Sequence, residues 1–455
     1  MEQQQELSSC SASARAMDIF EIRSLVGLYL DCQQRALCSM VSKAWRNTFS
    51  PMIYLSVDLS TEFDIFQGSS SAGLPPEDLI RRHGETIKDL SICLPGSYIR
   101  VLLSTVRHLE SLKVVRTTEQ CTSQNGPVEL RLLMEFNSSL QKLEFVGFQG
   151  PLIATSLKEI GPTCHQLKRL SFIQSNLSLE RIVDIMRIAP QVTRLSIDRC
   201  IVAGFVPGRI FTQPLFPHLE HLEFVNSGDH LVVLVPATTR SLQPPEERTV
   251  DESSTFWLYP KLRTLIVRGQ LKKAAPLQRL LRQCPQMTEF TLHGSPFTYD
   301  TFRLLSSRFD MLTRIDLLES GMDVYYTGAG ANNFMICDEI LWSCSQLVYF
   351  GYPDYGDRLD YPSYELRQYG NEESRVWTCS GLKTLKFKQL QWSRRVSWNE
   401  RTMEQLSTLT ALEVFEVGSM SGKADDEIRQ MAQAWPRLGR FSCLRSSLPA
   451  QATSS

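Results

Sequence analysis

The sequence Leu140-Gln141-Lys142-Leu143-Glu144-Phe145 has apolar residues at its first, fourth and sixth positions. This six-residue block returns about thirteen times, mostly at intervals of about 20 to 30 residues, so the chain contains a repeat array rather than a chance run of leucines. The blocks begin at Ile87, Leu109, Leu140, Leu167, Val192, Leu219, Leu262, Met287, Leu312, Leu347, Leu382, Leu412 and Leu438.

Each block is typical of a β-strand whose three apolar side chains point inward while the residues between them point outward. Between blocks lie stretches with helical spacing of apolar residues, such as 178–188 and 276–282. A strand followed by a helix and another strand at this period predicts parallel strands stacked edge to edge, with helices on the convex side. The predicted fold class is an α/β solenoid, a horseshoe of about thirteen parallel strands.

The composition excludes several broad classes of protein. With 48 basic and 49 acidic residues the net charge is -1, so no global field attracts the chain to nucleic acid or to an anionic membrane. The 12 cysteines are scattered without a C-x-x-C pair, which indicates reduced, mostly buried thiols. No apolar run is long enough to span a bilayer and no secretory leader is visible, so we expect a soluble protein of the cytoplasm, the nucleus or both.

The pattern divides the chain into five parts. Residues 1–16 are polar and rich in Gln and Ser, as in a disordered N-terminus. Residues 17–60 form a small helical module, in which Ser50-Pro51 is expected to end the last helix. A linker or capping segment at 61–86 leads to the repeat array at 87–446. The array is interrupted by excursions at 228–255, 319–333 and 351–378, and a disordered tail follows at 447–455.

The repeat array resembles the leucine-rich repeat family, especially its cysteine-containing intracellular class. Cys284-Pro285-Gln286-Met287-Thr288-Glu289-Phe290-Thr291-Leu292 is similar to the C-P-x-L-x-x-L-x-L line of that class. Leu195-Ser196-Ile197-Asp198-Arg199-Cys200 is similar to its L-x-L-x-x-C ending. The likeness implies a leucine-rich-repeat horseshoe.

The helical module resembles an F-box. Its most specific element is Val41-Ser42-Lys43-Ala44-Trp45-Arg46, with Glu21-Ile22 before it and Pro51-Met52-Ile53-Tyr54 after it in the family's order. The family usually has Leu-Pro or Ile-Pro ahead of the glutamate, where this chain has Ile19-Phe20. The residues that the resemblance implies for binding the linker subunit are Ile19, Phe20, Glu21, Ile22, Val26, Leu30, Leu37, Val41, Lys43 and Trp45.

An F-box followed by leucine-rich repeats is the arrangement of substrate receptors of SCF-type ubiquitin ligases. The resemblance implies that the module binds a Skp-family linker subunit and through it a cullin, while the repeats hold a target for ubiquitin-dependent degradation. Two alternatives stay open. The first is that the module's apolar side chains pack only on each other and on the first repeat. The second is a leucine-rich-repeat scaffold for protein interactions, without a ubiquitin ligase role.

No arrangement typical of an enzyme is visible, so we expect a non-catalytic adaptor without cofactor or metal. The run from His218 to Glu223 contains two histidines and two glutamates. It coincides with a repeat strand, so these side chains alternate outward at strand spacing, unlike the i, i+4 spacing of a helical metal site. We therefore do not predict a metal site there.

Two groups of residues are predicted to bind the target protein. The outward positions of four neighbouring blocks form a short basic row that could receive an acidic or phosphorylated segment, and the alternative is that exposed strand faces are polar for solubility. The second group is a tyrosine-rich acidic stretch, since tyrosine gives large contact area at low entropic cost. The residues of the two groups are Lys142, Arg169, Arg194 and His221, and Tyr352, Tyr355, Tyr361 and Tyr364.

Overall fold

The structure is a computed structural model of the 455-residue chain. It consists of two compact units, Met1–Asn176 and Leu177–Ser455, and each is described by itself. The residues that the structure describes are 20–30, 32–60, 76–94, 98–116, 126–148, 165–178, 182, 189–203, 217–226, 259–271, 274–322, 333–355, 376–391, 404–421 and 435–445.

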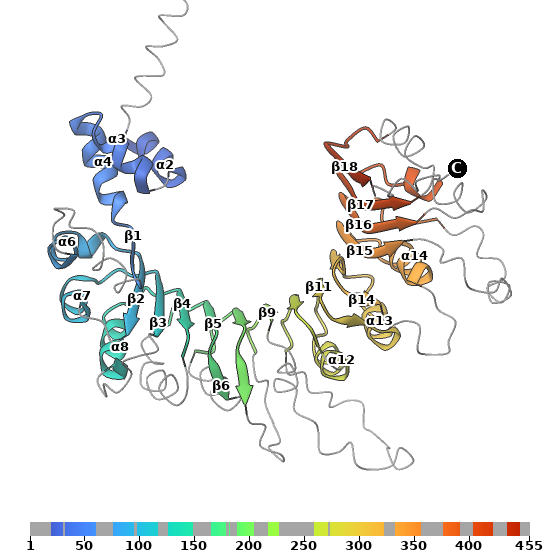
Figure 1. Ribbon diagram of the computed structural model, residues 1–455, viewed down its shortest axis with the longest axis horizontal. Coiled ribbons are helices and arrows are strands. Elements are labelled where there is room, and N and C mark those ends of the chain that lie inside the picture. Colours follow the sequence, from blue (N-terminus) through green and yellow to red (C-terminus); the bar gives the residue numbers. More distant parts are fainter. Residues whose placement is uncertain are drawn as a thin grey trace, which may run out of the picture. The chain divides into compact units, whose positions relative to one another are not determined.

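The first unit joins a cluster of helices to a parallel sheet (Figure 1). The cluster contains α2 (Phe20–Tyr29), α3 (Cys32–Ser39) and α4 (Lys43–Ile53). The sheet contains, in order, β1 (Ser56–Leu59), β2 (Asp89–Leu94), β3 (Ser111–Arg116), β4 (Lys142–Val146) and β5 (Arg169–Ile173). The elements between the strands are α6 (Pro76–His83), the 3-10 helix η1 (Gly84–Thr86), α7 (Ile99–Thr105) and α8 (Gly126–Glu135), and β6 (Asn176–Ser178) lies at the division between the units.

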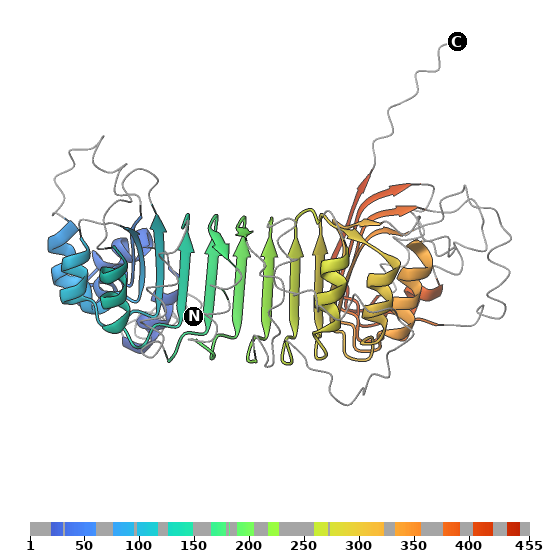
Figure 2. The same ribbon diagram turned by 90° about the horizontal axis from the view of Figure 1, so that it is seen from below.

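The second unit continues the same alternation, with its strands running in one direction (Figure 2). Its sheet contains β7 (Arg194–Asp198), β9 (His221–Val225), β10 (Thr264–Arg268), β11 (Glu289–His293), β13 (Arg314–Asp316), β15 (Tyr349–Tyr355), β16 (Thr384–Gln391), β17 (Val414–Ser421) and β18 (Arg440–Arg445). The other described elements are β8 (Ile201–Ala203), α12 (Ala275–Arg282), α13 (Tyr299–Ser306), α14 (Asn333–Ser343) and the parallel pair β12 (Pro296–Phe297) and β14 (Gly321–Met322).

The predicted solenoid of parallel strands is confirmed. Each of the thirteen blocks contains a strand that begins at its third residue, and the first apolar residue lies in the turn before it. Among the described residues, 14 strands take part in this parallel pairing, one more than the thirteen blocks predict. The additional strand is β1, which the sequence pattern had placed at the end of the helical module. It pairs with β2 from Ser56↔Asp89 to Leu59↔Ile92, so the module ends inside the sheet.

The three apolar side chains of a block form the core of a repeat. Leu140, Leu143 and Phe145 have no exposed surface, and in most other blocks of both units each of the three side chains is at most 3% exposed. Phe145 stacks on Phe172 of the next strand, with ring centroids 5.7 Å apart. Each buried side chain contributes about 1.5 to 3 kcal/mol before entropy is subtracted, so a repeat depends on its neighbours to cover this surface.

A shared carbonyl sets the start of most strands of the long sheets. The Glu110 carbonyl accepts hydrogen bonds from the backbone N–H groups of Gln141 (2.8 Å) and Lys142 (3.0 Å). In the second unit the Glu220 carbonyl accepts from Arg263 and Thr264, both at 2.9 Å. Repetition of this contact from strand to strand keeps the blocks in register, because a slip by one residue would turn the inward side chains outward.

A left-handed residue follows several strands. Gly269 has φ +120°, and its N–H donates to the His293 carbonyl of the next repeat at 2.9 Å. The other described residues with positive φ at this position are Gly147, Gln174, Arg199, Asn226 and Gly294. The positive φ turns the chain away from the sheet while its N–H still bonds to the neighbouring repeat.

Buried polar side chains satisfy the backbone between repeats. Asn137 accepts from the Leu109 N–H (2.9 Å) and donates to the Leu133 carbonyl (2.7 Å). Arg308 donates to the carbonyls of Cys284 (2.9 Å) and Leu281 (2.6 Å). Both side chains are buried, so they supply the partners that water gives to exposed turns.

Several predicted boundaries need adjustment. The helix expected at 276–282 is confirmed as α12, whereas most of 178–188 and all of 228–255 lie outside the described residues. Pro51 does not end α4: the helix loses one backbone donor at the proline and continues for two more residues, to Ile53. The excursion expected from residue 351 begins later, since pairing with β16 carries β15 to Tyr355. Of the excursion expected at 319–333, Gly321–Met322 form β14 and Asn333 is the first residue of α14, while 323–332 lie outside the described residues.

Substitution of Gly269 by alanine is expected to destabilise the second unit. A Cβ at this position would lie 2.9 Å from the Asn226 Cα, and φ +120° strains any residue with a side chain. We expect the free energy of unfolding to fall by about 1 to 3 kcal/mol, measured by urea denaturation. Gly381→Ala is the control, because nothing lies within 4 Å of a Cβ there. Equal stability of the two variants would contradict this account of the turn.

Candidate protein-binding surfaces

The helical cluster has a small but specific interior. Phe49 of α4 has no exposed surface, and its ring lies 5.3 Å from that of Trp45. A Cβ at Gly27 would lie 2.6 Å from the Met52 Sδ atom, so α2 packs closely on α4 here and a larger residue would require the Met52 side chain to move. Arg35 of α3 donates to the carbonyls of Gly27 (2.8 Å) and Met52 (3.0 Å) and so connects all three helices.

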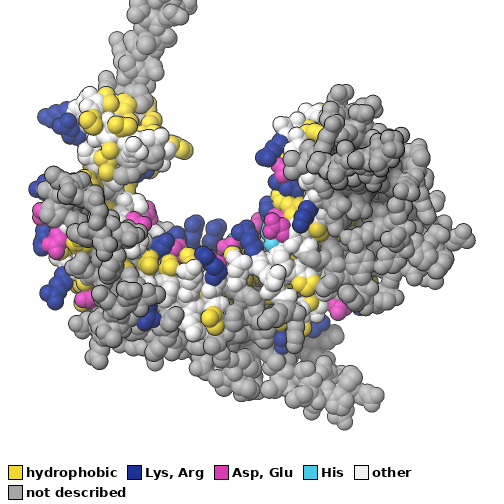
Figure 3. Space-filling model, in the orientation of Figure 1, with side chains coloured by type: hydrophobic (Ala, Val, Ile, Leu, Met, Phe, Trp, Pro, Cys, Tyr) yellow, Lys and Arg dark blue, Asp and Glu magenta, His cyan; other side chains and the backbone are white. Residues whose placement is uncertain are grey.

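The same cluster leaves a large apolar surface uncovered. Seven of the twelve large hydrophobic side chains that are exposed in the described part of the chain lie on residues 20–41, and Figure 3 shows hydrophobic side chains gathered over these helices. On α2 they follow helical spacing, with Leu25, Leu28 and Tyr29 at 59%, 62% and 89% exposed. We call this set the module surface, and its members are Phe20, Leu25, Leu28, Tyr29, Leu37, Met40 and Val41.

The module surface differs in part from the residues that the F-box resemblance implied. Phe20, Leu37 and Val41 are on it, Glu21 and Lys43 are exposed polar residues, and Ile19 lies outside the described residues. The partly buried residues of the implied set are Ile22, Val26, Leu30 and Trp45. The sequence reasoning missed Leu25, Leu28, Tyr29 and Met40. The i, i+3, i+4 spacing of Leu25, Leu28 and Tyr29 was visible, but spacing alone does not tell which of two apolar stripes on α2 faces α4.

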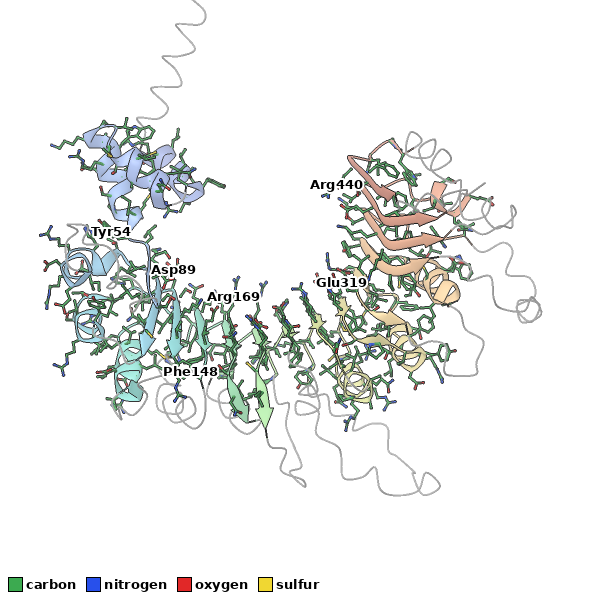
Figure 4. All side chains as sticks on the ribbon, viewed as in Figure 1. Tyr54, Asp89, Phe148, Arg169, Glu319 and Arg440 are labelled. Carbon is green, nitrogen blue, oxygen red and sulfur yellow. The ribbon has the colours of Figure 1, made fainter. Side chains whose placement is uncertain are left out.

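Packed contacts join the helical cluster to the first repeats. The ring of Tyr54, which Figure 4 labels, stacks on His83 of α6, with centroids 3.9 Å apart and an interplanar angle of 11°. The Leu55 carbonyl accepts from the N–H groups of Lys88 and Asp89, both at 2.9 Å. Burial and the neighbouring charge of Arg82 lower the pKa of His83, which favours the neutral, stacked ring. The cluster is therefore held against the sheet of its own unit.

In the first unit, the predicted residues Lys142 and Arg169 are neighbours. They are paired positions on β4 and β5, and both side chains are exposed. Arg169 projects from the side of the sheet away from α7 and α8 (Figure 4). Glu144 lies 3.5 Å from the ammonium groups of both Lys142 and Lys113.

In the second unit, the predicted residues Arg194 and His221 are paired positions on β7 and β9. Arg194 is exposed and His221 is half-buried. Beside them Glu223 accepts from the Ser196 hydroxyl (3.4 Å) and lies 3.6 Å from Arg268. Among the described residues no group of three or more His, Cys, Asp or Glu could hold a metal ion.

The predicted tyrosine group is corrected at one position. Tyr352 is completely buried, and its ring packs 5.5 Å from that of Phe350, so it belongs to the core and cannot contact a partner. The reason is its place as the last inward residue of a block, which outweighs the tyrosine-rich composition around it. Tyr355 is the last residue of β15, while Tyr361 and Tyr364 lie outside the described residues.

A polar cluster around Asp316 was missed by the sequence reasoning. Its carboxylate accepts from the Tyr349 hydroxyl (3.1 Å) and lies 3.1 Å from His293 Nε2 and 3.3 Å from Arg314. The Arg314 guanidinium also lies 3.7 Å above the Tyr349 ring. Asp316 is nearly buried, and a Cβ at Gly351 would meet its Oδ1 atom at 2.9 Å, so the glycine makes room for the carboxylate.

The described cysteines are mostly core residues. Six of the seven are buried, and burial raises the pKa of Cys284 and of Cys379 to about 12. These two thiols therefore remain protonated near neutral pH and are poor nucleophiles. None of the described helices is both long and apolar enough to cross a bilayer.

Comparison with known proteins gives a distant likeness. No protein-family profile matches the sequence, and no curated protein matches it. Ninety chains of solved structures match, among them one described as a crystal structure of a TLR13–ssRNA13 complex, with 12% identity and a TM-score of 0.31. The match covers 79% of this chain and 57% of that one, so this chain spans little more than half of its length. The assignment of a solenoid rests on the strands and their register.

Acid should weaken the second unit through Asp316. Burial by itself raises the pKa of this carboxyl, but hydrogen bonds from His293, Tyr349 and the Leu318 N–H, with the attraction of His293, lower it overall. A lowered pKa means that the carboxylate stabilises the fold above pH 3.8, and that this contribution is lost as the pH falls through the folded value. We expect Asp316→Asn to reduce the free energy of unfolding at pH 7 by about 1 to 3 kcal/mol.

The measurement is the urea midpoint at pH 7 and near pH 3. The difference between the wild type and Asp316→Asn should shrink at the lower pH. The control is Asp89→Asn, because Asp89 is exposed on its strand. A constant difference at both pH values would show that Asp316 does not contribute through its charge.

Proposed function

We propose that this protein is a non-catalytic substrate receptor of an SCF-type E3 ubiquitin ligase. The helical module would bind a Skp-family linker subunit and through it a cullin, and the repeats would hold a target protein. The observation that carries the proposal is the module surface, where seven large apolar side chains are exposed on α2, on α3 and in the turn before α4, against five in the rest of the described residues. Such a concentration is typical of a protein-binding surface.

The F-box-like motif has a physical role in this arrangement. Ser42 is the N-cap of α4, and its hydroxyl accepts from the Trp45 N–H at 3.2 Å. Trp45 packs toward Phe49, while Val41, directly before the cap, is 66% exposed. The motif thus starts α4, anchors it to the interior and leaves an apolar residue at the turn for a partner.

The junction between module and repeats supports a receptor role. Because β1 pairs with β2 and Tyr54 stacks on His83, a partner on the module would have a defined orientation to the repeats of the same unit. A receptor needs this property, since the target has to be presented to a catalytic subunit elsewhere in the complex. The chain would supply binding and orientation, and the ligase would supply the chemistry.

The second candidate is a leucine-rich-repeat-like scaffold without a ubiquitin ligase role. It is favoured by the start of α2, where Phe20 stands in place of the proline usual in the family and is 58% exposed. In that case a protein other than the linker subunit would cover the module surface. The two candidates share the repeats and differ only in what binds the module.

The test is recovery of a purified Skp-family subunit by the full chain. Replacing Leu28 and Met40 by aspartate places two charges in the module surface, and we expect recovery to fall at least about 30-fold, because each lost apolar anchor costs about 1 to 2 kcal/mol. The control carries Val348→Asp and Val376→Asp, two exposed apolar residues in the second unit, and should bind like the wild type.

The outcomes separate the two candidates. Linker binding by the wild type and its loss only in the Leu28/Met40 variant would support the receptor. If the wild type fails to bind any Skp-family subunit, the ligase proposal is wrong and the scaffold remains. Thermal denaturation of each variant shows whether the fold is retained, which is expected because all four side chains are on the surface.

A further inference from the structure

The outward side chains of β3, β4 and β5 form a small grid on the first unit. The strands are in register, so residues at equivalent positions lie side by side in three rows. We call this grid the β3–β5 face. Its rows are Ser111, Lys142 and Arg169, then Lys113, Glu144 and Ser171, then Val115, Val146 and Ile173.

The exposed charge of this face is positive. It carries three cations and one anion, and the Glu144 side chain is only 14% exposed, while Lys113 and Lys142 are 44% and 46% exposed. Each ammonium lies 3.5 Å from a different oxygen of Glu144. The carboxylate therefore positions the two lysines from below, and their outer sides are available to an anionic partner.

Arg169 adds an available guanidinium at the edge of the grid. It is exposed, and within the described residues no ion pair involves it. A planar guanidinium can bind a carboxylate through two hydrogen bonds. On the opposite side the basic row ends, because the position paired with Ser111 is Asp89 of β2. The basic row therefore does not extend onto β2.

An apolar row runs beside the cations. Val115, Val146 and Ile173 are half-buried, so part of each side chain faces outward. On each strand, the residue of this apolar row comes four residues after the residue of the first row. Each row runs perpendicular to the strands, from β3 to β5. A partner that covers the whole face must present acidic side chains along one line and apolar side chains along a parallel line.

The spacing of the rows selects a helix as the partner. Neighbouring strands are ~4.8 Å apart, and side chains on one face of a helix recur every ~5.4 Å, which is one turn. The two spacings between three strands therefore match two helical turns to within about 1 Å. Same-side residues of an extended peptide are ~6.7 Å apart and would be out of step by about 4 Å over the same distance.

We infer that the β3–β5 face binds an acidic amphipathic helix of a protein partner, lying across the strands. Carboxylates of the helix pair with Lys113, Lys142 and Arg169, and its aliphatic side chains cover Val115, Val146 and Ile173. The inference rests on the proposed function, for which it specifies the class of target segment. It differs from the predicted basic row, because the apolar row and the helical spacing come from the register of the strands.

The probe is a fluorescent alanine-based helical peptide of about five turns, with glutamates along one line and leucines along the adjoining line. Binding to the full chain is followed by fluorescence anisotropy, and the affinity should fall as salt is added. Lys142→Glu with Arg169→Glu should weaken binding at least about 30-fold, since each charge-assisted contact contributes a factor of about ten. The control, Arg81→Glu with Arg100→Glu, makes the same charge change on exposed helical residues and should alter binding less than about twofold.

Further comparisons address the apolar row and the geometry. Val146→Ser with Ile173→Ser should weaken binding about tenfold. A peptide of the same composition with alternating Glu and Leu should bind more weakly than the helical one. Tighter binding of the alternating peptide, or unchanged binding by the Lys142/Arg169 variant, would overturn the proposal.

If the Lys142→Glu, Arg169→Glu variant has a lower melting temperature than the wild type, Lys142→Gln with Arg169→Gln takes its place. The expected loss of peptide affinity is then about tenfold.

The Leu28→Asp, Met40→Asp variant keeps this proposal separate from the ligase proposal. It should bind the peptide like the wild type, because the module surface takes no part. If this variant loses binding of the linker subunit but binds the peptide normally, the module surface binds the linker and takes no part in the helix site. Normal linker binding without any peptide binding would refute the helix site and leave the receptor proposal intact.

Discussion

Every repeat of this protein depends on burying three apolar side chains against the repeat beside it. Leu140, Leu143 and Phe145 show the pattern, with no exposed surface at any of the three. One strand cannot cover these side chains by itself, so stability comes from stacking and accumulates along the chain. The shared carbonyl at the start of most strands and the left-handed residue that follows several strands maintain the spacing that stacking requires.

The helical module is likewise stabilised by packing against a neighbouring repeat. It has few interior residues, chiefly Phe49 with Trp45 and Met52 around it, and such a small core stabilises a domain poorly by itself. Its last residues enter the sheet as β1, and the Tyr54–His83 stack fills the junction. The module therefore obtains its stability from the first repeat while most of its apolar helix surface stays available for a partner.

The sequence predicted much of the fold and less of the binding surfaces. Thirteen strands followed from the blocks because burial imposes a regular spacing on apolar residues. β1 was missed, since Ser56–Leu59 has no full block and owes its strand conformation to pairing with β2. On the module, spacing showed apolar helix faces but not which one α4 covers. Tyr352 was assigned to a surface by its neighbours in the chain, whereas its inward position in the block buries it.

By itself, the sequence determined the architecture: a repeated apolar triad has few ways to leave water, and parallel stacking is the one that its period allows. Only the tertiary structure decided which side chains remain exposed or come together. Asp316, Arg314, Tyr349 and His293 come from three strands far apart in the chain, and their cluster depends on the room that Gly351 leaves. The three rows of the β3–β5 face likewise arise from strand register. Burial is an average property that a local pattern can encode, whereas a binding surface depends on distances between segments that no local pattern contains.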